Sequence, residues 1–252
     1  MLGGLVAVLK FGSSILRTEE DLPRVVEEIR FWTKGGARVV AVVSAFGNTT
    51  EALFDLGRKY GDGSNEEAMA ALVVTGEQAA AGLLALALAS AGVRSRLLDP
   101  VEIRLRAAGV PLDARLCGVN AEEIRRALAE CPAVVIPGFI GRTARGSLAL
   151  LGRGGSDLTA LFLAGALGAD RCRLVKDVDG IYASDRKASP EATHGAVPNR
   201  YEHLDWEEAL GLDGGVVQPK ALRFAAENRV SVEVAALGRA RGTTVGKTRG
   251  GF

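Results

Sequence analysis

The chain has 252 residues, 48% hydrophobic and 24% charged, and its 31 Lys and Arg against 30 Asp and Glu leave a net charge of +1. This composition is typical of one large or two small globular domains and excludes a disordered chain. Because there is no basic excess, we expect neither nucleic acid nor a membrane surface as a partner. The three cysteines stand apart without a CxxC pair or a histidine cluster, so we expect free thiols, no metal-ligand set and a cytoplasmic location.

Apolar runs alternate with helical patterns along the chain. Continuous apolar runs predict strands buried on both faces at 5–9, 39–43, 133–136, 173–175 and 230–235. Helical patterns cover 19–34, 49–60, 65–91, 121–130, 156–167, 205–212 and 219–228. A Gly-containing turn at 143–146 predicts a β-hairpin between 139–142 and 147–151. The alternation predicts an α/β fold, a three-layer αβα sandwich with a mainly parallel central sheet.

The longest uncharged stretch covers residues 79–93. It is shorter than the roughly 18 to 20 residues that a membrane-spanning helix needs, so we expect a buried core helix. The first apolar run is followed by Lys10 without a cleavage-like site, which argues against a secretory signal.

Two polar motifs directly follow predicted strands. Lys10 and Gly12 close the first strand, where a cation and bare amides can cradle a phosphate, although a simple strand-ending turn explains the motif equally well. Ser44 and Thr49 follow the second strand. Thr49 is either a helix N-cap or, with Ser44, a polar contact for a substrate.

Three further motifs place charges among apolar or glycine-rich residues. Glu77 lies in an apolar helix and needs a partner, either a structural arginine or a substrate ammonium. Arg153 and Asp157 stand in a Gly-rich turn that opens a helix, where the helix dipole favours anions and an arginine can clamp a carboxylate. Lys176 and Asp177 end the fourth strand, at an edge where a nucleotide or only a turn could follow.

Taken in order, these motifs resemble the amino acid kinase family, most closely the catalytic domain of aspartokinases. The resemblance runs from Lys10 to about Gly246, and its most specific segments are 137–141, 151–157 and 177–182, which read Pro-Gly-Phe-Ile-Gly, Leu-Gly-Arg-Gly-Gly-Ser-Asp and Asp-Val-Asp-Gly-Ile-Tyr. Shorter matches lie at 42–45, 76–77 and 242–244. The resemblance implies a single domain over 1–252, with an acceptor-binding lobe at about 1–145, a nucleotide-binding lobe at about 146–252, and no ACT regulatory domain.

The resemblance also implies roles for individual residues. On the nucleotide side, Lys10 bridges the transferring phosphoryl group, Asp157 orients the site, and the phosphates and nucleotide are bordered by Gly12, Ser13, Lys176, Asp177, Tyr182 and Lys187. The amino-acid pocket is formed by Ser44, Thr49, Glu77, Arg153 and Ser156. Within it, Glu77 faces the α-ammonium and Arg153 holds the α-carboxylate.

The chain departs from the family pattern at several of these positions. Its Gly12-Ser13-Ser14 loop is closer to glutamate 5-kinase than to aspartokinases. Lys176 stands where the family usually has Thr, and Gly215 stands where it has a lysine that contacts ATP. Lys176 and Lys220 are the candidates to restore that cation.

The implied activity is ATP-dependent and Mg²⁺-dependent phosphorylation of an amino-acid side-chain carboxylate, L-aspartate to 4-phospho-L-aspartate, by a cytoplasmic homodimer. A carboxylate is already a nucleophile, so no general base is needed, and Asp157 and Asp177 are expected to hold Mg²⁺ only through water. Two alternatives remain open. One is a kinase of the same fold that acts on glutamate or an aspartate-like metabolite, and the other is a non-catalytic subunit that binds nucleotide or amino acid.

Overall fold

The computed structural model describes residues 4–183, 199–212 and 215–247. Eight strands form the central sheet in the order β10-β12-β11-β9-β1-β2-β6-β3. Their bounds are β1 Val6–Phe11, β2 Arg38–Val43, β3 Ser95–Leu97, β6 Ala133–Pro137, β9 Arg171–Lys176, β10 His203–Leu204, β11 Val232–Ala236 and β12 Thr243–Val245. Every neighbouring pair is parallel except β11 with β12. The five predicted strands are therefore confirmed as a parallel set.

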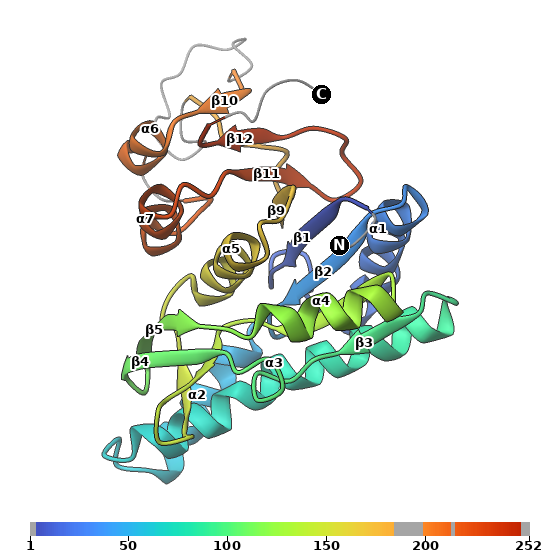
Figure 1. The fold of residues 1–252 in the computed structure, drawn as a ribbon. Coiled ribbons are helices and arrows are strands. Elements are labelled where there is room, and N and C mark those ends of the chain that lie inside the picture. The colour runs from blue at the N-terminus through green and yellow to red at the C-terminus, as the bar shows by residue number, and fades with distance from the viewer. Residues whose placement is uncertain (1–3, 184–198, 213–214, 248–252) are drawn as a thin grey trace.

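Helices cover both faces of this sheet (Figure 1). The apolar cluster on one face joins the sheet to α1 (Leu22–Lys34) and α3 (Glu66–Ser90). The cluster on the other face joins it to α4 (Ala121–Glu130), α5 (Gly155–Leu167), α6 (Trp206–Gly211) and α7 (Pro219–Glu227). The predicted three-layer αβα sandwich is confirmed. The first helix begins later than expected, because Glu19–Asp21 forms a separate 3₁₀ turn before Pro23 enters the first turn of α1.

A second, four-stranded sheet has the order β5-β4-β7-β8. Its strands are β4 Arg106–Val110, β5 Asp113–Gly118, β7 Ile140–Arg142 and β8 Leu148–Leu150. The antiparallel pair β7–β8 is the predicted hairpin, whereas β4 and β5 were not predicted. A third apolar cluster joins this sheet to the first half of α3, with α2 (Thr49–Tyr60) packed alongside.

Helix α3 has one buried and one exposed face. By length and composition it is the one described helix that could span a membrane, with a mean hydropathy of 1.6, and 44% of that apolar window is buried in the molecule. Ala80, Leu84 and Leu88 pack against the sheet, whereas Leu83 and Leu86 are exposed. The expected burial of this helix is thus observed on one of its faces, and the other face is exposed.

The three cysteines carry free thiols, as expected. The division into lobes at about residue 145 stays a prediction, and the central sheet runs across it, since β9 lies directly beside β1.

Candidate active site

The carboxyl ends of five parallel strands meet at one edge of the central sheet. In register, Phe11 lies beside both Val43 and Val175. Val43 lies beside Pro137, and Lys176 lies beside Ala236. The loops that follow these strands are therefore neighbours, at the edge where open α/β sheets bind ligands.

A buried carboxylate joins two lysines at this edge. Asp157 Oδ1 lies 2.8 Å from Lys10 Nζ, and Asp157 Oδ2 lies 2.8 Å from Lys176 Nζ. Lys10 and Asp157 are only 6% and 3% exposed. Two ammonium groups on one carboxylate leave one uncompensated positive charge, which is expensive in a buried place and favours an anionic ligand.

The strand pleat brings the two lysines to Asp157. Side chains alternate between sheet faces, so Lys10 shares the α5 face with Val8, and Lys176 shares it with Leu174. Lys10 then curls over the following turn, where a Cβ on Gly12 would collide with its ammonium nitrogen. Only glycine leaves this space, so Gly12 serves the placement of Lys10.

The glycine-rich segment starts α5 and so places Asp157 in the first helical turn. Gly154 is the N-cap with φ of 79°, and a Cβ there would lie 2.5 Å from Gln218 Cβ, so both the backbone and the packing require glycine. Thr159 Oγ1 accepts a 3.1 Å hydrogen bond from the amide of Phe139, which ties α5 to the loop after β6. Asp157 is therefore held by two elements far apart in sequence.

Electrostatics support an ionised Asp157. Burial acts to raise its pKa, but the charges and hydrogen bonds of Lys10 and Lys176 outweigh burial and lower the pKa below its usual value. Burial and the neighbouring Lys10 lower the pKa of Lys176, against the opposing effect of Asp157. The cluster thus carries its charges in close contact.

Glu77 lies beside this cluster with half of its carboxylate unused. It is 2% exposed, and its Oε2 has no hydrogen-bond partner among the described residues. Burial raises its pKa to about 8, against the lowering effects of the Ala45 amide and the Lys10 charge. No arginine pairs with Glu77 in the described part of the chain, and its contact with a substrate ammonium stays a prediction.

The other residues of the implied amino-acid pocket lie around these groups. Ser44 is half-buried after β2, and its amide donates to Phe11 O at 3.0 Å. Thr49 is not the N-cap but the first residue of α2, with Asn48 before it, and its Cγ2 lies 3.1 Å from where a Cβ on Gly76 would be. Ser156 is buried against Gly138.

Arg153 and Ser13 are exposed. Arg153 stands in the turn before α5, and within the described residues it makes no ion pair or side-chain hydrogen bond. Ser13 lies in the turn after β1, where Gly12 O accepts hydrogen bonds from the amides of Ile15 and Leu16. The contact of Arg153 with an α-carboxylate stays a prediction.

Among the residues expected on the nucleotide side, Asp177 is exposed and Tyr182 donates a 2.5 Å hydrogen bond to Asp179 Oδ1. Lys187 lies outside the described residues. The structure thus brings together Lys10, Asp157 and Lys176, with Glu77 close enough to interact electrostatically with Lys10.

Lys220 is not free to replace a missing cation. Its Nζ donates to Asp113 Oδ1 at 2.5 Å, to Leu151 O at 2.6 Å and to Ala114 O at 3.2 Å. It therefore fastens the Gly-rich turn to β5. Of the two candidate lysines, Lys176 is the one in the ion cluster.

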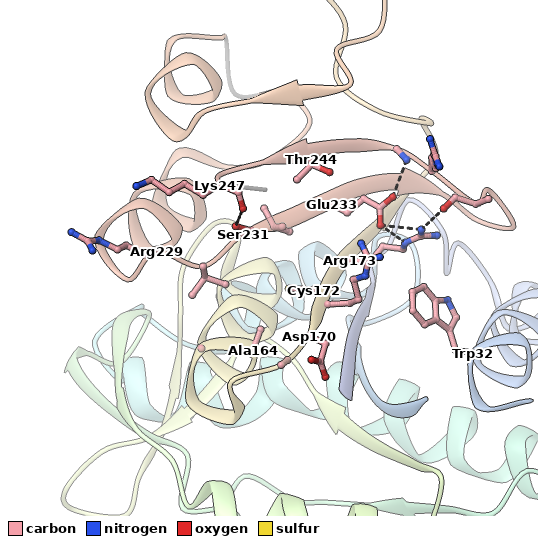
Figure 2. Close-up of a pocket in the computed structure, with 18 of the residues that line it drawn as sticks. Trp32, Ala164, Asp170, Cys172, Arg173, Arg229, Ser231, Glu233, Thr244 and Lys247 are labelled. Atoms are coloured by element: carbon pink, nitrogen blue, oxygen red, sulfur yellow. Dashed lines mark hydrogen bonds and ion pairs between the residues drawn. The ribbon is translucent and has the colours of Figure 1, made fainter. Parts of the chain in front are cut away.

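A groove of about 640 Å³ lies elsewhere (Figure 2), and Lys10, Glu77, Asp157 and Lys176 are not among the residues that line it. It is lined by the start of β9, by β11 and by the loop before β12. Strand ends and buried charge, rather than hollow volume, locate the candidate active site.

A buried cation pair at the carboxyl edge of a mostly parallel sheet defines an α/β protein suited to anionic ligands. The chain belongs to the amino acid kinase family, whose sequence model matches residues 6–236. It is 34% identical over 230 residues to the aspartate kinase of Stutzerimonas stutzeri, covering 90% of this chain and 54% of that protein. It is also 34% identical over 248 residues to the aspartokinase of Geobacillus stearothermophilus, covering 95% and 58%.

Among solved structures, an aspartate kinase from Synechocystis superposes with a TM-score of 0.81 at 29% identity, covering 96% of this chain and 39% of that one. The chain therefore spans slightly more than half the length of the curated relatives it matches.

Proposed function

We propose that the chain transfers the γ-phosphoryl group of ATP to the side-chain carboxylate of an amino acid, L-aspartate, giving ADP and 4-phospho-L-aspartate. The observation that carries this proposal is the buried, half-unpaired carboxylate of Glu77 beside the cation-rich cluster of Lys10, Asp157 and Lys176. An amino acid with an acidic side chain has the complementary charges, an ammonium for Glu77 and a carboxylate for the lysines. The names of the curated relatives support aspartate as the acceptor.

In this proposal the protein positions the two substrates and neutralises the charge of the phosphoryl group, and it forms no covalent bond to either substrate. A carboxylate oxygen of the acceptor attacks the γ-phosphorus, and the bond from that phosphorus to the bridging oxygen of ADP breaks. Lys10 and Lys176 stabilise the negative charge on the phosphoryl oxygens, and Asp157 holds both ammonium groups at the reaction point. Arg153 is proposed to clamp the acceptor's α-carboxylate.

Mg²⁺ is part of the proposal and fits as an ion carried by the phosphates. Within the described residues no group of three or more acidic, histidine or cysteine side chains could hold a metal ion by itself. Both oxygens of Asp157 already contact lysines, which leaves Asp177, exposed at the end of β9, as the water-mediated partner. When bound, the ion supplies charge neutralisation on the ATP phosphates.

The homodimer also belongs to the proposal. Beyond its first turn, the exposed face of α3 carries Thr75, Gln78, Leu83 and Leu86 and no charged residue, and such a surface suits a second copy of the chain. The cytoplasmic location rests on cysteine usage alone.

Hydroxylamine trapping tests the activity directly, because it converts an acyl phosphate into a coloured hydroxamate. We expect product with aspartate, ATP and Mg²⁺, and none when any of the three is omitted. Product with glutamate alone would move the acceptor to the longer side chain, which the Gly12-Ser13-Ser14 loop already suggests. No product with any acidic amino acid, despite binding of ATP, would favour a non-catalytic binding subunit.

A further inference from the structure

The loop 237–242, which joins β11 to β12, starts beside the ion cluster. Ala236, the last residue of β11, pairs in register with Lys176, the last residue of β9. The loop therefore leaves the sheet at the carboxyl edge, next to the lysine that contacts Asp157. The loop opens with a turn closed by a 3.2 Å hydrogen bond from the Arg239 amide to Ala236 O, and side-chain contacts hold the rest of it.

Arg173, in β9, binds the backbone of this loop through its guanidinium group (Figure 2). The side chain is 5% exposed, and its Nε and Nη2 lie 3.0 and 2.9 Å from Glu233 Oε2. Its Nη1 donates to Arg239 O at 2.7 Å, and its Nη2 also donates to Ala240 O at 2.9 Å. A planar guanidinium can serve a carboxylate and two carbonyls at once, which an ammonium cannot do in the same geometry.

The carboxylates of Glu28, which is buried, and Glu233, which is partly buried, hold the amides of the same loop. Glu28 Oε2 accepts from the amide of Gly238, and Glu233 Oε1 accepts from the amide of Gly242, each at 2.9 Å. Trp32 Nε1 donates to Glu28 Oε1 at 3.0 Å, and its ring lies 5.2 Å from the Arg173 guanidinium. Both ends of the loop are thus fixed to the sheet and to α1.

Thr243, directly after the loop, links the loop by hydrogen bonds to the segment that follows β9. Its hydroxyl accepts from the amide of Ile181 at 2.8 Å and donates to Tyr201 O at 2.6 Å. A Cβ on Gly180 would lie 2.5 Å from the same hydroxyl, so the two segments are in close contact. Arg200 adds a second link, donating to Asp179 O at 3.1 Å and to Arg241 O at 3.4 Å.

We propose that Arg173 is a positioning residue for the nucleotide, acting through the loop 237–242 and Thr243 on the segment 177–182. This inference rests on the proposed function, in which ATP lies against Lys176 and that segment. It assigns a purpose to a buried arginine that touches neither Lys10 nor Asp157 by any contact in the described structure. Loosening the loop then weakens ATP binding and leaves the aspartate pocket, on the Glu77 side, unchanged.

Arg173→Lys tests this by keeping the charge and removing the fork. We expect faster amide hydrogen exchange in peptides covering 177–182 of the ATP-free protein, and a rise of about 2- to 30-fold in the dissociation constant for ATP by calorimetry. The KM for aspartate should stay within about twofold of the wild-type value, a split that a general loss of stability does not produce.

Arg125→Lys is the matched control. Arg125 also combines an ion pair, with Glu122, and hydrogen bonds to the backbone carbonyls of Ala166 and Leu167, but at the far end of α5. It should leave ATP affinity and exchange at 177–182 unchanged. If Arg173→Lys does not fold, Thr243→Val removes the next link, and Thr243→Ser, which keeps the hydroxyl, should restore wild-type ATP binding.

The outcomes separate the two proposals. Unchanged exchange at 177–182 in folded Arg173→Lys or Thr243→Val overturns the inference, as does unchanged ATP affinity in those variants. If the variants show faster exchange at 177–182 but the wild-type protein does not bind ATP, the structural coupling is supported. That result overturns the proposed function.

Discussion

The raised pKa of Glu77 makes the amino-acid side of the site testable by pH. With a pKa of about 8, Glu77 is mostly protonated at pH 7 in the free protein, and a neutral carboxyl cannot pair with an ammonium. Only the ionised fraction binds the substrate well, about one tenth at pH 7 and one half at pH 8. The KM for aspartate should therefore fall about fivefold between pH 7 and 8, and less than twofold more by pH 9.

Glu77→Gln removes the charge and keeps the shape. A charge-assisted contact is worth about 1.5 to 3 kcal/mol, so we expect a KM about 10- to 150-fold above the wild-type value at pH 9, with no dependence on pH between 7 and 9. The measurement is initial-rate hydroxamate formation at saturating ATP, in buffers of constant ionic strength.

Stability gives an independent reading of the same group. Because the folded-state pKa of Glu77 lies above its usual 4.5, the folded chain holds this proton where the unfolded chain has lost it, and the free energy of unfolding falls as pH rises from about 4.5 through about 8. The full difference amounts to at most about 5 kcal/mol. Glu77→Gln should therefore unfold at a higher temperature than the wild type at pH 9, and at a similar temperature near pH 4.5.

An unchanged aspartate KM in folded Glu77→Gln would refute the ammonium contact. A pH dependence of KM that survives in this variant would show that another group titrates. A variant less stable than the wild type at pH 9 would mean that Glu77 has a structural partner in the protein.

Three further substitutions test the remaining charges. Lys176→Thr should weaken ATP binding by about 10- to 150-fold, and Gly215→Lys should restore much of this loss, because no atom of the described residues lies within 4 Å of a Cβ at Gly215. Equal ATP affinity of Lys176→Thr and wild type by calorimetry would refute the compensation. Lys10→Ala should lower kcat by about 10²- to 10³-fold, and near-normal turnover would remove Lys10 from the mechanism. Arg153→Lys should raise the KM for aspartate more than that for ATP, and the reverse order would place Arg153 on the nucleotide side.

Much of the fold could be predicted because the central strands are buried on both faces. In β2 and β6 nearly every residue is buried, and such continuous apolar runs are visible in the sequence. The strands β4 and β5 bury few residues, and Gly109 interrupts β4, so neither periodicity nor composition marks them. The pairing of β10 with β12 could not be predicted, because two- and three-residue strands carry no pattern of their own.

The site could be predicted as far as strand order determines it. Lys10 and Lys176 both end parallel strands, so their meeting at one edge follows from the fold class. The position of Asp157 between the two lysines depends on the turn through Gly154, which the fold class does not determine. The contact of Lys220 with Asp113 joins residues more than 100 positions apart along the chain. The sequence does carry one signal of the contacts around Arg173. Arg173 stands in a segment predicted as an apolar strand, and a buried charge in such a place requires buried partners.

The two lysines and Glu77 give the site groups of both signs of charge. A ligand with one sign of charge would satisfy the lysines or Glu77, but not both. In the proposed reaction, an acidic amino acid would present an ammonium at one end and a carboxylate at the other, and the phosphates of ATP would supply the anion that the pair of lysines lacks. The phosphates would thus remove a desolvation penalty that the two lysines carry in the free protein.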